Sequence, residues 1–197
     1  MELPIFPLNG AVLFPDTSLP LNIFEKRYLE MVDHALSKNR FIGMIQTKDN
    51  GQLFNVGCMG KIHSFNETSD GRYLISLQGI SCFKVMEELK TSYSFRSVKA
   101  NKLDNKIDNY IFSDDQKNLL LKLYADYISI KNINLNLKDI ENIEMDQIIK
   151  FIAMVSPFNN IDKQALLEAD SLLEFFNKLL SIFELELAGD ISSKSIN

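Results

Sequence analysis

The sequence lacks the residue patterns that mark most enzymes and metal proteins. It has two histidines and two cysteines in 197 residues, and no GxxxxGK[ST] loop to hold a nucleotide phosphate. The nearest candidate, Gly60-Lys61, is followed by Ile62 where a hydroxyl residue must bind magnesium. His34 and His63 lie far apart, without Cys or carboxylate partners at ligand spacing. We therefore expect no enzyme activity, no metal and no cofactor.

Long apolar runs and dense basic runs are absent as well. No apolar stretch approaches the roughly 18 residues that cross a bilayer, and the start of the chain has Glu2 and prolines where a secretion signal needs positive charge. The net charge is -5, so we expect neither nucleic acid nor membrane as a partner. These absences predict a cytoplasmic protein. Cys58 and Cys82 each lie in a strand-like run, and we expect buried thiols more than a disulfide.

Proline-broken apolar runs fill the first 23 residues. Pro4, Pro7, Pro15 and Pro20 each lack a backbone donor and restrict φ, so only short extended pieces fit between them. From Phe24 to Lys38 the apolar residues recur every three or four positions, which predicts an amphipathic helix with Phe24 on its buried face.

The rest of the first half is typical of strands, and the second half of helices. A hairpin turn is predicted at Asp70-Gly71, and Gly79 should lie between two strands. The predicted strands are Glu2–Phe6, Ala11–Phe14, Phe41–Gln46, Val56–Phe65, Tyr73–Leu77, Ile80–Glu87 and Tyr93–Leu103. Four helices are predicted in the second half. The first begins at Asp114, after a capping box at Ser113, and the others begin at Met145, at Asn160 and after Asp170. The last of them should end near Gly189.

These patterns predict an α+β protein of two parts. Residues 1–103 should form a mostly antiparallel, barrel-like unit crossed by one helix, and residues 104–190 a helical bundle. The second part is the acidic one, because residues 104–197 carry nine basic and sixteen acidic side chains. Residues 191–197 are predicted to be a disordered tail.

The chain resembles the Lon amino-terminal domain family, the substrate-recognition module of ATP-dependent Lon proteases. The resemblance rests on segments at both ends and through most of the first half: LPIFPLNGAVLFP, LPLNIFEKRY, FIGMI, VGCMGKI, DGRYLISLQGISCFKV and PFNNIDKQALLEADSLLEFFNKLLSIFELEL. It implies a PUA-like first unit and a free-standing member without ATPase or protease domains. Asp16 stands where the family usually has glycine, and Asn22 where histidine is common.

The resemblance implies a non-enzymatic module that binds unfolded or exposed polypeptide, alone or as an adaptor for a protease or chaperone in proteolysis or quality control. The residues expected to contact a peptide are apolar ones in the proline-rich segment, namely Phe14, Leu19, Leu21 and Ile23. Alternatively, Phe14, Leu21 and Phe24 form the seam between the sheet and its helix. Two other functions stay open: a barrel that binds RNA or a small molecule, and a scaffold whose acidic helical half binds a partner. The oligomeric state does not follow from the sequence.

Overall fold

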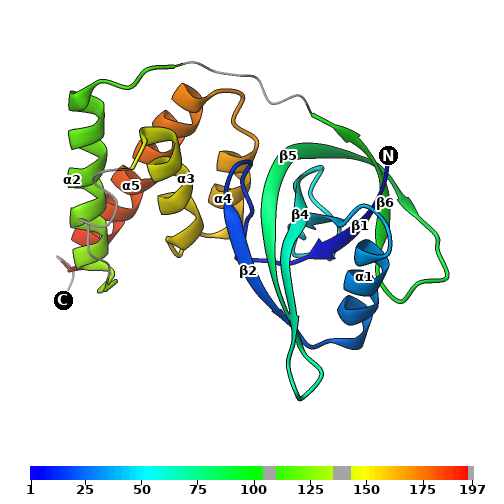
Figure 1. Ribbon diagram of the computed structural model, residues 1–197. Coiled ribbons are helices and arrows are strands. Elements are labelled where there is room, and N and C mark those ends of the chain that lie inside the picture. The colour runs from blue at the N-terminus through cyan, green and yellow to red at the C-terminus, as the bar shows by residue number, and fades with distance from the viewer. Residues whose placement is uncertain (104–109, 135–142, 195–197) are drawn as a thin grey trace. The chain divides into compact units, whose positions relative to one another are not determined.

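The computed structural model describes residues 1–103, 110–134 and 143–194 (Figure 1). The chain divides into two compact units. Unit 1 comprises Met1–Asn105 and Ser156–Glu168, and unit 2 comprises Lys106–Val155 and Ala169–Asn197. The chain therefore leaves unit 1, returns to it for one short segment and leaves it again. This division differs from the single cut near residue 103 that the sequence predicted.

Unit 1 is built on one mixed sheet of six strands. The strands are β1 (Glu2–Pro7), β2 (Ser18–Ile23), β3 (Phe41–Ile45), β4 (Val56–Glu67), β5 (Tyr73–Leu89) and β6 (Ser97–Lys102). Their order is β2-β5-β4-β3-β1-β6, with β1 and β3 parallel, the other pairs antiparallel, and an additional pairing of β5 with β6. The sheet curls because the long β5 pairs with β2, β4 and β6 (Figure 1). The structure thus has a curled mixed sheet with an edge at β2, and it does not establish the narrower barrel-like, PUA-like description.

A close crossing of the chain explains two errors in the predicted strands. Residues 11–14 are not a strand, because the chain turns at Asp16 (φ 65°) and its backbone bonds to β5 instead. The Asp16 amide donates to the Gly79 carbonyl at 3.0 Å, and the Gly79 amide to the Thr17 carbonyl at 2.8 Å. A Cβ on Gly79 would lie 2.0 Å from the Phe14 carbonyl oxygen, so only glycine fits. Gly79 therefore lies inside one continuous strand and does not separate two.

Helix α1 (Lys26–Leu36) packs on the sheet by one face, as its periodicity predicted. Met31, Val32 and Ala35 are buried, and the rings of Tyr28 and Phe6 lie 4.3 Å apart. The prediction for Phe24 was wrong. Glu25 is the N-cap in extended backbone, so Phe24 precedes the helix, and its side chain is 67% exposed.

Helix α4 (Asn160–Leu167) belongs to unit 1 because its polar side chains bond to the backbone of that unit. The buried Lys163 ammonium donates to the Gly10 carbonyl at 2.8 Å, and burial lowers the pKa of this lysine. The Gln164 amide donates to the Val56 carbonyl at 3.0 Å, and the Gln46 amide to Gln164 Oε1 at 3.1 Å. These contacts join residues more than 100 positions apart, so no local pattern announces them.

Unit 2 contains α2 (Asp114–Ile130), α3 (Met145–Val155) and α5 (Leu172–Lys194) among its described residues. The predicted capping box is present, with Ser113 Oγ accepting from the Gln116 amide. The Tyr124 and Tyr127 rings lie 5.7 and 5.1 Å from Phe183, and α5 contacts both α2 and α3. The description of these helices as a bundle stays a prediction.

The last helix ends later than predicted. Ser171 Oγ accepts from the Glu174 amide at 3.0 Å near its start, and the helix runs past Gly189 to Lys194. Residues 191–194 are thus helical, and 195–197 lie outside the described residues. None of the helices within the described ranges is both long enough and apolar enough to cross a bilayer.

Candidate functional site

Strand β2 forms one edge of the sheet. It pairs with β5 from Ser18↔Gln78 to Ile23↔Tyr73, and in the described part of the chain it has no strand on its other side. Pro20 lies in the middle of β2, where a proline is tolerated because its missing N–H faces away from the neighbouring strand. In an antiparallel strand Ser18 and Asn22 then share that outward direction. The edge therefore offers backbone donors at two positions and carbonyl acceptors at three.

The structure places three of the four predicted peptide-contact residues on one face of β2. Leu19, Leu21 and Ile23 alternate along the strand, opposite Leu77, Ile75 and Tyr73 of β5. Leu19 and Leu21 are half-buried, whereas Ile23 is buried. Phe14, the fourth, is buried in the turn that crosses β5, with 2% of its surface exposed. Leu19 and Leu21 are thus the predicted residues that a partner can touch in the folded chain.

An exposed phenylalanine of β4 extends this apolar face, and a second exposed phenylalanine lies at the end of β2. Phe65 of β4 pairs with Ile75, which also pairs with Leu21, so Phe65 and Leu21 flank the same β5 residue. Phe65 is 42% exposed, and Phe24 follows β2 directly. We call Leu19, Leu21, Phe24 and Phe65 the β2 edge surface. Sequence reasoning did not select Phe65 as a peptide contact, although the predicted hairpin at Asp70-Gly71 fixes the register that pairs it with Ile75.

Tyr73 borders the β2 edge surface and ties it to α1. Its ring packs edge-on against Phe65, with centroids 4.9 Å apart. Desolvation raises the pKa of the Tyr73 hydroxyl, and a hydrogen bond to the Asp33 carboxylate of α1 raises it further. The hydroxyl therefore stays protonated at neutral pH and fixes the ring beside Phe65.

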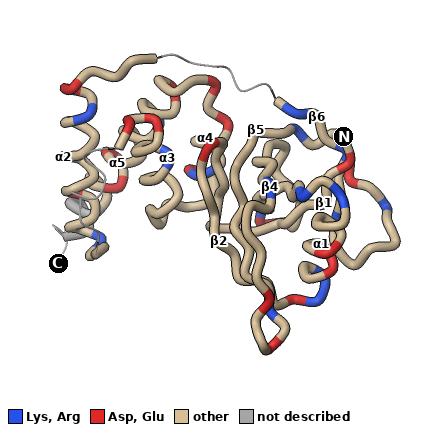
Figure 2. The backbone as a smooth tube through the Cα atoms, in the orientation of Figure 1, with Lys and Arg blue, Asp and Glu red and all other residues tan. Residues whose placement is uncertain are grey.

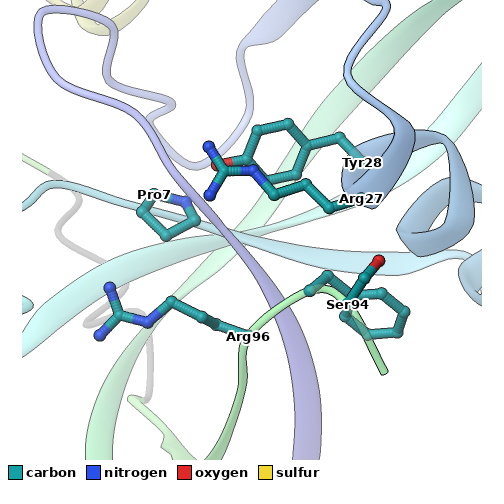
Figure 3. Close-up of a pocket in the computed structure, with 6 residues that line it drawn as sticks. Pro7, Arg27, Tyr28, Ser94 and Arg96 are labelled. Carbon is teal, nitrogen blue, oxygen red and sulfur yellow. The ribbon is translucent and has the colours of Figure 1, made fainter. Parts of the chain in front are cut away.

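A separate polar pocket of about 190 Å³ lies in unit 1. Figure 3 shows Arg27 and Tyr28 entering it from α1, and Ser94 and Arg96 from the segment before β6. Pro7 and Phe95 complete the lining. Small-molecule sites usually enclose about 300–1,000 Å³. The pocket therefore has room for one small chemical group.

Carboxylates already neutralise both arginines of the pocket. Arg27 pairs with Glu25 at 2.8 Å and lies over the Tyr28 ring, 4.5 Å from its centroid. Arg96 holds Glu88 through two bonds of 2.6 and 2.7 Å, which lowers the pKa of Glu88. Burial raises the pKa of the Tyr28 hydroxyl, against the opposing charge of Arg27. The pocket is balanced in charge and holds no unpaired cation that would attract an anion.

The distribution of charged and metal-binding groups gives no further candidate site. Figure 2 shows Lys and Arg scattered through unit 1 and interspersed with Asp and Glu, with no continuous basic track. His34 contacts the rings of Tyr93 and Phe95, at 4.7 and 5.4 Å, and His63 is exposed on β4. Within the described ranges, no three His, Cys, Asp or Glu side chains gather as metal ligands would.

Solved structures share this fold. The crystal structure of a Lon N-terminal domain protein from Xanthomonas campestris superimposes with a TM-score of 0.69 over 92% of this chain and 98% of that one, at 20% identity. The N-terminal domain of a Mycobacterium avium complex Lon protease gives 0.69 over 93% and 98%, at 13% identity. At these identities the likeness concerns the fold alone.

The sequence relatives are much longer proteins. The Lon protease of Dictyoglomus thermophilum is 26% identical over 196 residues, which cover 94% of this chain and 24% of that protein. Lon protease 2 of Bdellovibrio bacteriovorus is 33% identical over 100 residues, 47% of this chain and 12% of that protein. The chain thus spans about a quarter of the length of the relatives that it matches along most of its own length.

The family comparison covers nearly the whole chain. The match to the family model of the ATP-dependent protease La (LON) substrate-binding domain runs over residues 2–184, through both compact units. It concerns the substrate-binding part of these proteases and not their catalytic part. The chain therefore belongs to the Lon substrate-binding domain family.

Proposed function

We infer that this chain is a recognition module that binds extended apolar segments of unfolded polypeptide at the β2 edge surface and does no chemistry on them. The observation that carries this proposal is the coincidence of an unpaired strand edge with apolar side chains beside it, in a chain of the substrate-binding family. A peptide that adds to a sheet edge gains main-chain hydrogen bonds whatever its sequence. Apolar contacts then select unfolded segments, whose hydrophobic residues are exposed.

The β2 edge favours a short and reversible contact. Pro20 removes one donor, which weakens pairing between two such edges and protects the chain from aggregation. Ser18 and Asn22 keep their outward amides, so a short extended segment still finds partners on both sides of the proline. Because the client would be held by few backbone bonds, we expect affinities in the micromolar range, about -8 kcal/mol.

The bound polypeptide would pass to another protein. The family resemblance supports a protease or a chaperone as the partner, in the cytoplasm, with this chain as an adaptor in proteolysis or quality control. A crosslinking pull-down from the native extract, with the wild-type chain and a variant that does not bind polypeptide, tests this. A partner captured by both forms is the downstream protein, and one lost with the variant is a client.

The proposal is tested by titrating a labelled, reduced and alkylated protein that cannot fold. We expect Leu21→Asp and Phe24→Asp each to weaken binding about tenfold, since each replaces about 1–2 kcal/mol of apolar contact by a charge. Asn22→Pro should weaken it similarly by removing an outward amide without changing the apolar side chains. The matched control is Ile111→Asp, at an 89% exposed position in unit 2, which should bind as the wild type does.

Folding must be checked beside binding, by circular dichroism and thermal melting of every variant. If the three variants of the β2 edge surface all bind the unfolded protein as tightly as the wild type, this surface is not the site. If the wild type itself does not bind at high micromolar concentration, the proposed function is wrong.

The alternatives have less support. Figure 2 shows Lys and Arg scattered through unit 1 without the continuous basic track that RNA binding requires, and the pocket beside Arg27 and Arg96 is smaller than ordinary ligand sites. We therefore expect no shift of labelled RNA at low salt, where electrostatic binding is strongest. A salt-sensitive complex would favour RNA over polypeptide.

A further inference from the structure

Cys58 and Cys82 lie directly opposite each other in the sheet, although 24 positions separate them in the sequence. They are Cα partners in the antiparallel pairing of β4 with β5. Directly opposed residues in such a pair have Cα atoms about 4.5–5.5 Å apart and point to the same face. A disulfide needs Cα atoms about 4.4–6.8 Å apart. The backbone therefore already has the spacing that a disulfide requires.

The two thiols differ in access. Both are reduced in this structure. Cys58 is fully buried, whereas Cys82 is partly exposed, and its Sγ lies 3.7 Å from the Leu167 carbonyl oxygen at the end of α4. The thiolate is the form that reacts with oxidants, and Cys82 is the more accessible of the two thiols, so peroxide reaches Cys82 first.

We propose that Cys58 and Cys82 form a site of oxidative modification, at which peroxide converts the cross-strand thiols into an intramolecular disulfide. The Cys82 thiolate attacks one peroxide oxygen, the O–O bond breaks, and water leaves after protonation, which gives a sulfenic acid. The Cys58 thiol then attacks that sulfur, forms the S–S bond and releases the oxygen as a second water. Two thiols lose two electrons and two protons in total, and one peroxide molecule takes them up.

Oxidation would also remove a hydrogen bond to the backbone of α4. The S–H of Cys82 donates to the Leu167 carbonyl in the reduced chain, and a disulfide removes this donor. Gln164, near the same end of α4, bonds to the Val56 carbonyl, two residues before Cys58 on β4. The segment Ser156–Glu168 connects the two stretches of chain that make up unit 2. The disulfide therefore lies beside the carboxyl end of α4 within unit 1.

The test treats the full chain with hydrogen peroxide under native conditions and follows its mass. We expect a product lighter by two hydrogen atoms, a Cys58–Cys82 crosslink in non-reducing peptide maps, and return of the original mass with a phosphine reductant. Cys58→Ser should instead give a sulfenic acid at Cys82 that a dimedone probe traps. A matched control, Cys58→Ser with Ser64→Cys, keeps two cysteines but moves one six residues along β4, out of register. It should form the crosslink at least about tenfold more slowly, because the thiols are too far apart.

Two results would overturn the proposal. One is that the native wild-type chain stays reduced, or forms only dimers or higher oxides, at a peroxide concentration that does form the crosslink when the chain is unfolded in urea. The other is equal crosslinking of the out-of-register control, since register would then play no part. Amide exchange measures the effect on α4: the oxidised chain should exchange several-fold faster at residues 164–168, and unchanged exchange there would refute the coupling.

Discussion

The two units of this chain are specified by different kinds of information. Unit 1 depends on pairs of residues that are distant in sequence, such as Gly79 with Phe14 and Gln164 with Val56. Unit 2 shows more local signals, such as the capping box at Ser113 and the stacked rings of Tyr124 and Tyr127, three residues apart in α2. The comparison teaches that a fold can be inferred from sequence where its contacts are local, and that close approaches between distant segments must be seen in the structure.

The largest effect is expected at the crossing over β5. Gly79→Ala places a Cβ against the Phe14 carbonyl, which cannot move without breaking the bonds between Gly79 and residues 16 and 17. We expect a loss of about 3 kcal/mol or more in the free energy of unfolding. Urea denaturation followed by circular dichroism measures it.

Gly189→Ala in α5 is the matched control for this comparison. Its added Cβ meets nothing within 4 Å, and alanine favours the helix, so we expect a gain of about 0.5–1 kcal/mol. Equal effects of the two substitutions would contradict the view that unit 1 alone depends on a close backbone approach.

The next effect tests whether α4 is held by unit 1. Gln164→Ala removes the donor to the Val56 carbonyl and the acceptor for the buried Gln46 amide. Unpaired buried polar groups cost about 1–3 kcal/mol each, so we expect a loss of about 2–3 kcal/mol. Amide exchange should show weaker protection at the start of β4. Gln147→Ala in α3, whose side-chain amide donates to the adjacent Asp146 carboxylate at 3.2 Å, should cost less than about 0.5 kcal/mol.

A smaller effect is expected from the local signal that starts unit 2. Ser113→Ala removes the oxygen that accepts the Gln116 amide, and such caps contribute about 1 kcal/mol. Ser113→Asp keeps an acceptor at the same place and should restore most of this stability. The loss should be confined to amide exchange in α2. Faster exchange in β4 or β5 would show that the cap matters beyond its own helix.

Sequence reasoning predicted what local chemistry determines. The hairpin at Asp70-Gly71, the face of α1 and the start of α2 all follow from nearest neighbours, and the structure has each of them. The prediction of a strand at residues 11–14 was wrong because this apolar segment is buried where the chain crosses β5, and strand pairing is not what buries it. The prediction for Phe24 was wrong because Glu25 is the N-cap of α1, so Phe24 lies before the helix.

The candidate site was predictable in part. Leu19 and Leu21 were selected from the sequence because apolar residues among prolines are hard to bury, and the structure leaves both half-buried on an edge strand. Phe65 was not selected, since its proximity to Leu21 depends on the register of β4, β5 and β2 together. Cys58 and Cys82 face each other because of that same register.

The backbone at Asp16 explains why the family usually has glycine there. Its φ of 65° is a conformation that favours glycine and that aspartate also tolerates.

The smallest effect concerns a pair of charges in unit 1. Arg96 bonds to both oxygens of Glu88 and lowers its pKa, so the folded chain releases this proton more readily than the unfolded chain. The resulting stability is complete above the unfolded pKa, about 4.3, and is lost as the pH falls through the lower folded pKa. Both side chains are over a third exposed, and solvent screening limits the contribution to less than about 1 kcal/mol. Glu88→Gln should therefore be slightly less stable than the wild type at pH 7, with a difference that disappears below about pH 3.

Denaturation curves across this pH range measure the difference. The control is Glu87→Gln, because the pair of Glu87 with Lys99 is more exposed and should contribute almost nothing. A difference that persisted at low pH would mean that Glu88 acts through packing and not through its charge.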